Sequence, residues 1–282
     1  MMTIRDTLQK ASKHLVLFPT AHLDSELLLA HALKKSREYL LMHADEEVPK
    51  EKQVIFDESL GQRLTGKPIA YLIHEKEFYG RKFYVDKRVL IPRPETELMV
   101  ELALNHATSN QQPATILDVG TGSGCIAITM ALERPDCEVI GLDISKDALE
   151  VAKKNAKRLG CENVKFIESD LLLSLRAQRS NLVILANLPY IGTETNRFIS
   201  EETERFEPHL ATFAGPDGLE LYRHLWKQIK ELKLNFSALF MEIGFSQAEV
   251  MTKEIKKYFP DFHMEIKNDL AGLSRLAILL AK

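Results

Sequence analysis

From about residue 95 onward, short apolar runs alternate with stretches of helical periodicity, and no other feature of the sequence constrains the fold as strongly. The apolar runs cover residues 115–119, 139–142, 164–167, 182–186, 238–243 and 276–280, and the helical patterns between them include residues 145–159 and 219–232. Strands that alternate with helices of this length form βαβ units. The sequence therefore predicts an α/β fold in which helices cover both faces of a mostly parallel sheet.

The last two candidate strands, His263–Lys267 and Ser274–Ala281, are joined by a short link that contains Gly272. A parallel pair needs a crossover of a dozen or more residues, so these two strands should pair antiparallel. We therefore expect a seven-stranded sheet that is mostly parallel and has an antiparallel last strand.

The first 70 residues show helical patterns only. Leu8, Ala11 and Leu15 have helical spacing, Ala21–Lys34 has the pattern of a second helix, and residues 49–66 that of another. These patterns predict a small helical bundle that stabilises the protein or recognises a partner. Aromatic and β-branched residues then surround a glycine turn within residues 75–89, which indicates a β-hairpin. The expected boundaries are 1–73 for the helical domain, 74–90 for the hairpin linker and 91–282 for the α/β domain.

Charge and composition exclude several classes of protein. The chain has 282 residues, of which 45% are hydrophobic, enough for a packed core. Its 37 Lys and Arg residues against 40 Asp and Glu give a net charge of −3, which argues against stable binding to nucleic-acid phosphates. No apolar run is long enough to span a membrane, and the charged N-terminus lacks the apolar stretch of an export signal. Three cysteines without CxxC spacing and nine scattered histidines predict no disulfide framework, no metal site and a reducing cytoplasm.

A glycine-rich loop follows the first strand of the α/β domain. Residues 116–124 read Ile-Leu-Asp-Val-Gly-Thr-Gly-Ser-Gly, and a helix is expected directly after them. Glycine lets the backbone turn tightly and approach a ligand, while the helix start offers unpaired N–H groups. The alternative is a tight turn that binds nothing. A dinucleotide-binding fingerprint would need its third glycine at position 125, where Cys125 stands.

The G-x-G-x-G spacing behind an acidic strand end resembles the methionine-binding loop of S-adenosylmethionine (SAM) methyltransferases. SAM carries a positive sulfonium and no pyrophosphate, so nearby carboxylates suit it. The resemblance implies a Rossmann-like class I methyltransferase domain, with S-adenosyl-L-homocysteine as the product and no metal. It also implies SAM contacts from Asp118, Gly120, Thr121, Gly122, Ser123 and Gly124.

Two further carboxylates follow the next two strands. Asp143 ends one strand, where a carboxylate can accept hydrogen bonds from both ribose hydroxyls. Its alternative role is at a helix N-terminus, although Ser145 is the better cap there. Asp170, followed by Leu171, could accept a hydrogen bond from the adenine amino group, or it could serve a turn.

After the fourth strand, residues 186–190 read Ala-Asn-Leu-Pro-Tyr. Asn187 emerges from an apolar run and must find polar partners, unless it is an ordinary turn former before proline. The segment resembles the N-P-P-Y motif of methyltransferases that modify planar nitrogens, in base amines or in side-chain amides. This resemblance implies catalytic and substrate contacts from Asn187, Leu188, Pro189 and Tyr190, and a SAM contact from Asn187 as well.

The chemistry explains these residue types. An amide nitrogen attacks a methyl group poorly because its lone pair is delocalised. The Asn187 side-chain oxygen and the Leu188 backbone carbonyl can hold the NH₂ group by its two N–H bonds and favour the charge that develops on nitrogen. Tyr190 can stack on the planar group. No strong general base is needed before transfer.

Longer segments make the resemblance more specific. Residues 91–97, Ile-Pro-Arg-Pro-Glu-Thr-Glu, are similar to the signature of the HemK-type release factor glutamine methyltransferases, and the other similar segments are 66–72, 77–80, 205–208, 217–219 and 269–275. The resemblance implies methylation of the side-chain amide nitrogen, N5, of the glutamine in the Gly-Gly-Gln loop of peptide chain release factors. It further implies that the helical domain recognises the release factor, that Arg93 contributes to the substrate pocket, and that the enzyme is a cytoplasmic monomer.

Two alternatives remain at this stage. Leu188 replaces the first proline of the family motif, and N-L-P-Y is characteristic of rRNA adenine dimethyltransferases. Those enzymes place their extra helices at the C-terminus and lack the segment at residues 91–97, which favours the release factor interpretation. The other alternative is a SAM-binding protein without catalysis, against which the joint presence of the glycine loop and Asn187 argues.

Overall fold

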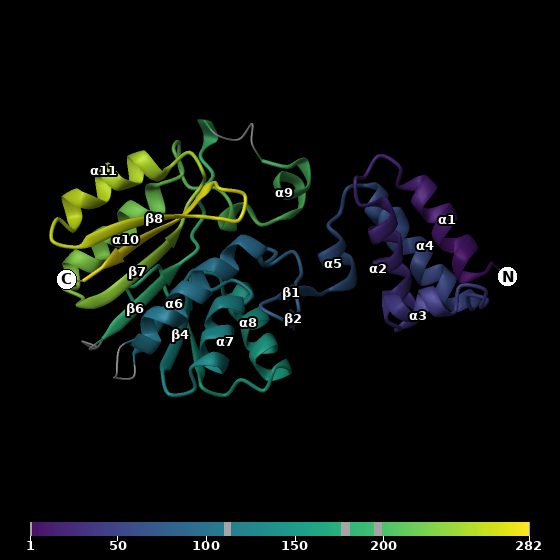
Figure 1. Cartoon of the computed structure of the whole chain (residues 1–282), viewed down its shortest axis with the longest axis horizontal. Coiled ribbons are helices and arrows are strands. Elements are labelled where there is room, and N and C mark those ends of the chain that lie inside the picture. The colour runs from purple at the N-terminus through teal and green to yellow at the C-terminus, as the bar shows by residue number, and fades with distance from the viewer. Residues whose placement is uncertain (1, 110–113, 176–180, 195–198, 282) are drawn as a thin grey trace. The chain divides into compact units, whose positions relative to one another are not determined.

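The computed structural model describes residues 2–109, 114–175, 181–194 and 199–281 (Figure 1). These residues form two compact units. One comprises Met1–Glu75 together with Ser200–Phe206, and the other comprises Lys76–Ile199 together with Glu207–Lys282. The short segment Ser200–Phe206 therefore packs with the helical unit, although it lies far along the chain, and nothing in the sequence patterns predicted this.

The helical unit contains α1 (Ile4–His14), α2 (Ala21–Leu33), α3 (Arg37–Met42), α4 (Lys50–Leu64), α5 (Ile69–Ile73) and α9 (Glu201–Phe206). The three longer helices of residues 1–75 follow the apolar patterns; the short α3 and α5 were not predicted. Its core gathers Ile4, Leu28, Leu29 and Phe56, all nearly inaccessible to solvent. Buried apolar side chains of α1, α2 and α4 therefore build the core of the bundle.

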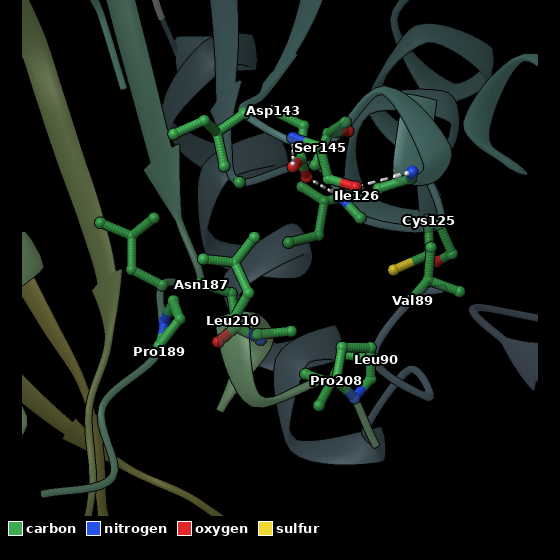
Figure 2. Close-up of a pocket in the computed structure, with 18 of the residues that line it drawn as sticks. Val89, Leu90, Cys125, Ile126, Asp143, Ser145, Asn187, Pro189, Pro208 and Leu210 are labelled. Carbon is green, nitrogen blue, oxygen red and sulfur yellow. Dashed lines mark hydrogen bonds between the residues drawn. The ribbon is translucent and has the colours of Figure 1, made fainter. Parts of the chain in front are cut away.

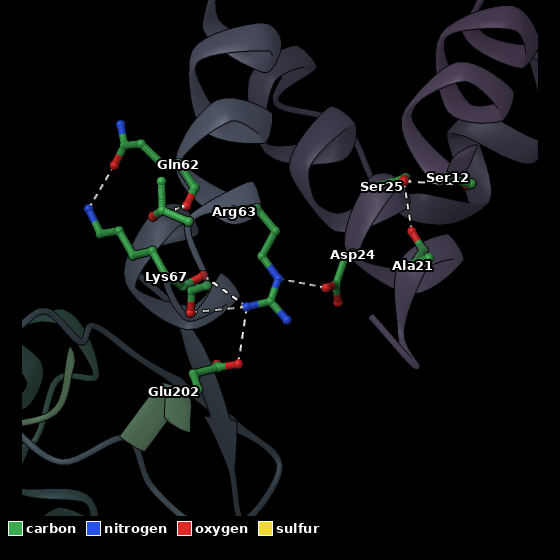
Figure 3. A network of polar contacts seen from close by, with 10 residues as sticks. Ser12, Ala21, Asp24, Ser25, Gln62, Arg63, Lys67 and Glu202 are labelled. Carbon is green, nitrogen blue, oxygen red and sulfur yellow. Dashed lines mark hydrogen bonds and ion pairs between the residues drawn. The ribbon is translucent and has the colours of Figure 1, made fainter. Parts of the chain in front are cut away.

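A buried arginine connects α2, α4 and α9 within the helical unit (Figure 3). Arg63 Nε donates to Asp24 Oδ2 at 2.8 Å, and its Nη1 donates to Glu202 Oε2 at 3.1 Å and to the Lys67 carbonyl at 3.0 Å. Arg63 and Asp24 are both buried, so their charges have to be paired. This network attaches α9 to the bundle.

The second unit is built on a seven-stranded sheet with strand order β5-β4-β3-β6-β7-β9-β8. The strands are β3 (Thr115–Val119), β4 (Glu138–Asp143), β5 (Val164–Glu168), β6 (Leu182–Ala186), β7 (Phe236–Glu242), β8 (His263–Asn268) and β9 (Ser274–Leu280). β9 runs antiparallel to both of its neighbours, and the pairs among β3 to β7 are parallel. The predicted α/β fold with an antiparallel last strand is confirmed.

Helices cover both faces of the sheet (Figure 1). On one face lie α6 (Glu97–Ser109), α7 (Cys125–Glu133) and α8 (Lys146–Arg158), and on the other lie α10 (Glu220–Glu231) and α11 (Ala248–Tyr258). The predicted hairpin is formed by β1 (Lys76–Phe78) and β2 (Arg81–Phe83), whose two phenylalanines are buried in the core of the first face. Two short 3₁₀ helices, η1 (Pro94–Thr96) and η3 (His209–Ala211), lie near the pocket described below. Within the described residues, no helix is long and apolar enough to cross a membrane.

Candidate active site

A pocket opens at the carboxyl ends of the parallel strands of the second unit (Figure 2). Most of the predicted site residues lie in its wall: Arg93, Gly120, Thr121, Gly122, Ser123, Asp143, Asp170, Leu171, Asn187, Leu188 and Pro189. In Figure 2, Asp143 and Ser145 lie at one end of the pocket, Leu90 and Pro208 lie at the other, and Asn187 lies between them. Among the residues that the structure describes, Asp118, Gly124 and Tyr190 are not part of this wall.

The glycine loop forms one side of the pocket in a backbone conformation that only glycine adopts easily. Gly120, Gly122 and Gly124 have φ values of 76°, 53° and 79°. The loop is held to β4 because the N–H groups of Gly120 and Thr121 both donate to the Leu142 carbonyl at 2.8 Å. A side chain at Gly120 would begin 3.0 Å from the Leu188 side chain. The loop therefore lies close against the N-L-P-Y segment.

Asp118 supports the loop from the protein interior. Its Oδ2 accepts hydrogen bonds from the Thr121 hydroxyl at 2.6 Å and from the Ala127 N–H at 3.1 Å. The side chain is fully buried, and burial raises the pKa of its carboxyl to about 7, against the opposing effect of these two bonds. Asp118 thus connects the loop to the start of α7 from behind the pocket wall.

Asp143 reaches the pocket from the end of β4. Its Oδ2 accepts from the Gly122 N–H at 2.8 Å and its Oδ1 accepts from the Ser145 N–H at 2.9 Å. Burial raises the pKa of this carboxyl, while the backbone hydrogen bonds lower it. Each oxygen has a second lone pair, so the carboxylate can still accept hydrogen bonds from two hydroxyls of a ligand.

Asn155 is a loop-positioning residue that the sequence analysis missed. Its Nδ2 donates to the Ser123 carbonyl and to the Tyr84 carbonyl, each at 2.9 Å, and its Oδ1 accepts from the Tyr84 N–H at 2.7 Å. The available signal was the position of Asn155 three residues after Ala152 on the apolar face of α8, because an asparagine buried on that face must find polar partners.

Asp170 and Leu171 form the third part of the cofactor side. Asp170 is exposed at the pocket wall, whereas Leu171 is nearly buried and has a φ of 50°. A leucine in the left-handed region is strained, and such strain often occurs at ligand sites. The neighbouring backbone is fixed because the Leu172 N–H donates to Gln228 Oε1 at 2.8 Å.

On the acceptor side, Asn187 belongs to a chain of hydrogen bonds that leads into the protein. Its Nδ2 donates to Thr96 Oγ1 at 3.1 Å, and the Thr96 hydroxyl donates to Glu242 Oε2 at 2.6 Å. The Tyr190 hydroxyl donates to the other oxygen of Glu242 at 3.3 Å. Burial raises the pKa of the Glu242 carboxyl, while Thr96, Arg275 and Tyr190 counteract that effect.

Glu242 was missed by the sequence analysis, although a signal for it existed. It ends the apolar run of β7, just as Asn187 follows the apolar run of β6. The parallel register pairs Ala186 with Met241, which places the next residues of the two strands side by side. Thr96 was noticed only as part of the segment at residues 91–97.

The leucine of the N-L-P-Y segment is buried, and its backbone amide has a partner. The Leu188 N–H donates to the Tyr222 hydroxyl at 3.4 Å, and the single proton of that hydroxyl is shared between the nearby backbone carbonyls of Ala186 and Glu242. Gln247 fixes the end of the same segment because its Nε2 donates to the Tyr190 carbonyl at 2.9 Å. The acceptor side is therefore rigidly supported.

Arg93 lies in the pocket wall and pairs with a buried carboxylate. Its Nη2 donates to Glu207 Oε1 at 2.6 Å, and the Glu207 side chain is only 2% exposed. Pro208 and Leu210, which follow Glu207, also line the pocket. Arg93 thus holds one wall of the pocket.

Among the described residues, no group of three or more His, Cys, Asp and Glu side chains is placed to hold a metal ion.

Comparison with known proteins agrees with this geometry. Residues 6–73 match the family described as "PrmC N-terminal domain", and residues 110–231 match the family described as "Methyltransferase domain". The chain is 38% identical to the release factor glutamine methyltransferase of Koribacter versatilis over 98% of both chains. It is 37% identical to that of Bacillus cereus over 89% of both chains. This chain belongs to the release factor glutamine methyltransferase family.

A solved structure supports the fold independently. The human Mettl16 catalytic domain in complex with a 3′UTR hairpin superposes with a TM-score of 0.57 and covers 90% of each chain at 15% sequence identity. At that identity the likeness shows the fold alone. Membership of the release factor glutamine methyltransferase family rests on the sequence relatives.

Proposed function

We propose that this protein transfers the methyl group of SAM to the side-chain amide nitrogen, N5, of the glutamine in the Gly-Gly-Gln motif of peptide chain release factors. The observation that carries the proposal is Asn187. Its amide NH₂ is engaged by Thr96 at 3.1 Å, so its oxygen is the end available to an N–H bond of the substrate. This arrangement, in a chain from the release factor glutamine methyltransferase family, favours an amide acceptor.

The cofactor side suits SAM. The glycine loop leaves room for a ligand because no side chain projects from its glycines, and the adjacent Asp143 carboxylate can accept from two ribose hydroxyls. Asp170 and Leu171 would contact the adenine. When bound, SAM supplies an electrophilic methyl group on a positive sulfonium. The carboxylate of Asp143, which lines the pocket, favours that charge.

The chain's own residues prepare the acceptor nitrogen. Asn187 Oδ1 and the Leu188 carbonyl accept the two N–H bonds of the glutamine amide and orient its nitrogen toward the methyl group. Both oxygens stabilise the positive charge that develops on nitrogen as the new N–C bond forms. Pro189 lines the surrounding wall, and Tyr190 supports it from behind through its hydrogen bond to Glu242. One proton leaves the nitrogen to solvent after transfer, so no strong base is required.

The test is mass spectrometry of the Gly-Gly-Gln peptide after release factor is incubated with this protein and SAM. We expect one added methyl group on the glutamine and none on naked rRNA treated in parallel. Dimethyladenosine in the rRNA together with an unmodified release factor would establish the rRNA alternative instead. SAM binding by isothermal titration without any methyl transfer would indicate a non-catalytic SAM-binding protein.

We further propose that the helical unit recognises the release factor and that the enzyme acts as a monomer in the cytoplasm, where translation occurs. Val16 and Leu17, after α1, are 73% and 92% exposed, so this unit presents two adjacent apolar side chains that a partner could cover. Replacing both by serine should raise the KM for release factor and leave SAM affinity unchanged. Val250→Ser is the matched control because Val250 is an exposed valine of α11 in the other unit. An unchanged KM would place recognition elsewhere.

A further inference from the structure

We propose that Glu242, acting through Thr96, is a positioning residue that fixes which end of the Asn187 amide faces the substrate glutamine. This inference rests on the proposed function and deepens it. An asparagine side chain has nearly the same shape in its two orientations, but one presents an acceptor and the other presents donors. Only the acceptor can hold the N–H bonds of a substrate amide.

The chain of contacts is short and almost entirely buried. Glu242 and Thr96 are 1% and 2% exposed, and the Thr96 hydroxyl lies 2.6 Å from Glu242 Oε2. The same hydroxyl lies 3.1 Å from Asn187 Nδ2. Thr96 is therefore the link between a buried carboxylate and the residue that faces the pocket.

The direction of these hydrogen bonds follows from counting protons. An ionised carboxylate has no proton and can only accept, so the single proton of the Thr96 hydroxyl is directed at Glu242. The hydroxyl then offers only lone pairs to Asn187, which must present its NH₂. If the amide turned end for end, its oxygen would face the Thr96 oxygen with no proton between them. The charge of Glu242 thus selects the orientation with Oδ1 in the pocket.

The surroundings of Glu242 favour its role as an acceptor. The Tyr190 hydroxyl donates to its second oxygen at 3.3 Å, and the charge of Arg275 acts on the same carboxylate. The Arg275 guanidinium is itself held by Asp269 at 3.0 Å. Hydroxyl donors and a nearby cation are what a buried carboxylate needs to stay charged.

The test compares isosteric variants. Glu242→Gln can donate to Thr96 and so no longer enforces the orientation, while Thr96→Val removes the link. We expect kcat for release factor methylation to fall about 10- to 100-fold in both, less than for loss of Asn187 itself. The KM for release factor and the Kd for SAM should stay within about twofold, because the hydrogen bond from the substrate to Asn187 Oδ1 strengthens mainly in the transition state. Thr96→Ser restores the hydroxyl and should recover most of the lost rate.

Thr129→Val is the matched control, since Thr129 is a buried threonine of α7 whose hydroxyl has no hydrogen-bond partner among the described residues. Its kcat should equal that of the wild-type protein. If Glu242→Gln and Thr96→Val also keep the wild-type kcat, the positioning role is wrong. A parallel loss of kcat, SAM affinity and thermal stability would assign Glu242 a merely structural role and would equally overturn the proposal.

A second measurement does not depend on activity. The side-chain NH₂ signals of Asn187 in a ¹⁵N spectrum can be assigned by their absence in Asn187→Asp. Their hydrogen exchange should accelerate in Thr96→Val and remain slow in Thr96→Ser. If exchange in Thr96→Val is unchanged, the proposed hydrogen bond between Thr96 and the Asn187 amide is wrong. This result does not depend on which substrate the protein methylates. A wild-type protein that shows slow exchange but methylates no release factor would refute the proposed function alone.

Discussion

The two sides of the pocket are assembled from the sequence in different ways. The cofactor side consists mainly of one continuous loop, Gly120–Gly124. Asp118 of β3 holds this loop through the Thr121 hydroxyl, and Asp143 at the end of β4 holds it through the Gly122 N–H. The acceptor side joins Thr96, Asn187 and Glu242, and the hydrogen bond between Thr96 and Glu242 spans 146 positions of the chain. A loop motif therefore defines the first side, whereas the register of the sheet defines the second.

The largest effect is expected at Asn187, and it tests whether the acceptor side controls the methyl-transfer rate without controlling SAM binding. Asn187→Ala removes an acceptor whose hydrogen bond strengthens as the nitrogen becomes positive, so the methyl-transfer rate should fall by about 10²–10³. SAM affinity should fall much less, because most of the proposed cofactor contacts lie on the glycine loop and Asp143. Single-turnover rates and titration with SAM measure the two quantities separately. Equal losses in both would mean that the two sides of the pocket are not separable.

The carboxylate beneath the glycine loop gives the cofactor side its own pH dependence. Because burial raises the pKa of Asp118 to about 7, the folded protein keeps a proton there that the unfolded chain has already lost above its usual value of 3.8. The free energy of unfolding should therefore fall as pH rises from 4 to about 7, by roughly 2–4 kcal/mol relative to Asp118→Asn. Urea unfolding at several pH values, with the exposed Asp147→Asn as control, measures this difference. Parallel curves for the wild type and Asp118→Asn would show that the carboxyl titrates normally.

The same contrast explains what the sequence could predict. Alternating apolar runs predicted the strands closely, with β6 at residues 182–186 as expected, because strands buried on both faces have little freedom in composition. The glycine loop was equally clear. Thr96, Asn155 and Glu242 were not identified as site residues, since their roles depend on which strands and helices become neighbours. The place of α9 in the helical unit depends on the Arg63 ion pair with Glu202, which no local pattern shows.

A smaller effect is expected at Asp143, and it should be confined to the cofactor side. Asp143→Ala should weaken SAM binding by roughly 1–3 kcal/mol, the range for lost hydrogen bonds to a charged group. Part of the loss would come from the glycine loop itself, because the Gly122 and Ser145 N–H groups would lose the hydrogen bonds that they now donate to Asp143. At saturating SAM the rate should approach that of the wild type. An unchanged SAM dissociation constant would show that Asp143 does not hold the ribose.

The smallest effect is expected at Leu188, where the two sides touch. Leu188→Pro keeps the backbone carbonyl and adds a ring that fixes φ. It loses an N–H that donates to Tyr222 at 3.4 Å, a long and therefore weak bond, and a side chain that lies against Gly120. Activity should stay within about tenfold of the wild type, or about 1.4 kcal/mol.

Single-turnover rates at saturating SAM and release factor separate the possible roles of this leucine. Leu188→Ala is the useful companion variant because it keeps the N–H and removes the contact with the loop. If Leu188→Pro and Leu188→Ala both stay active, residue 188 contributes only its backbone carbonyl to substrate binding. The acceptor side then tolerates leucine, proline or alanine at this position. If Leu188→Pro is as inactive as Asn187→Ala, the leucine side chain itself shapes the pocket. The N-L-P-Y segment would then mark a changed substrate, and methylation of an rRNA base would have to be tested again.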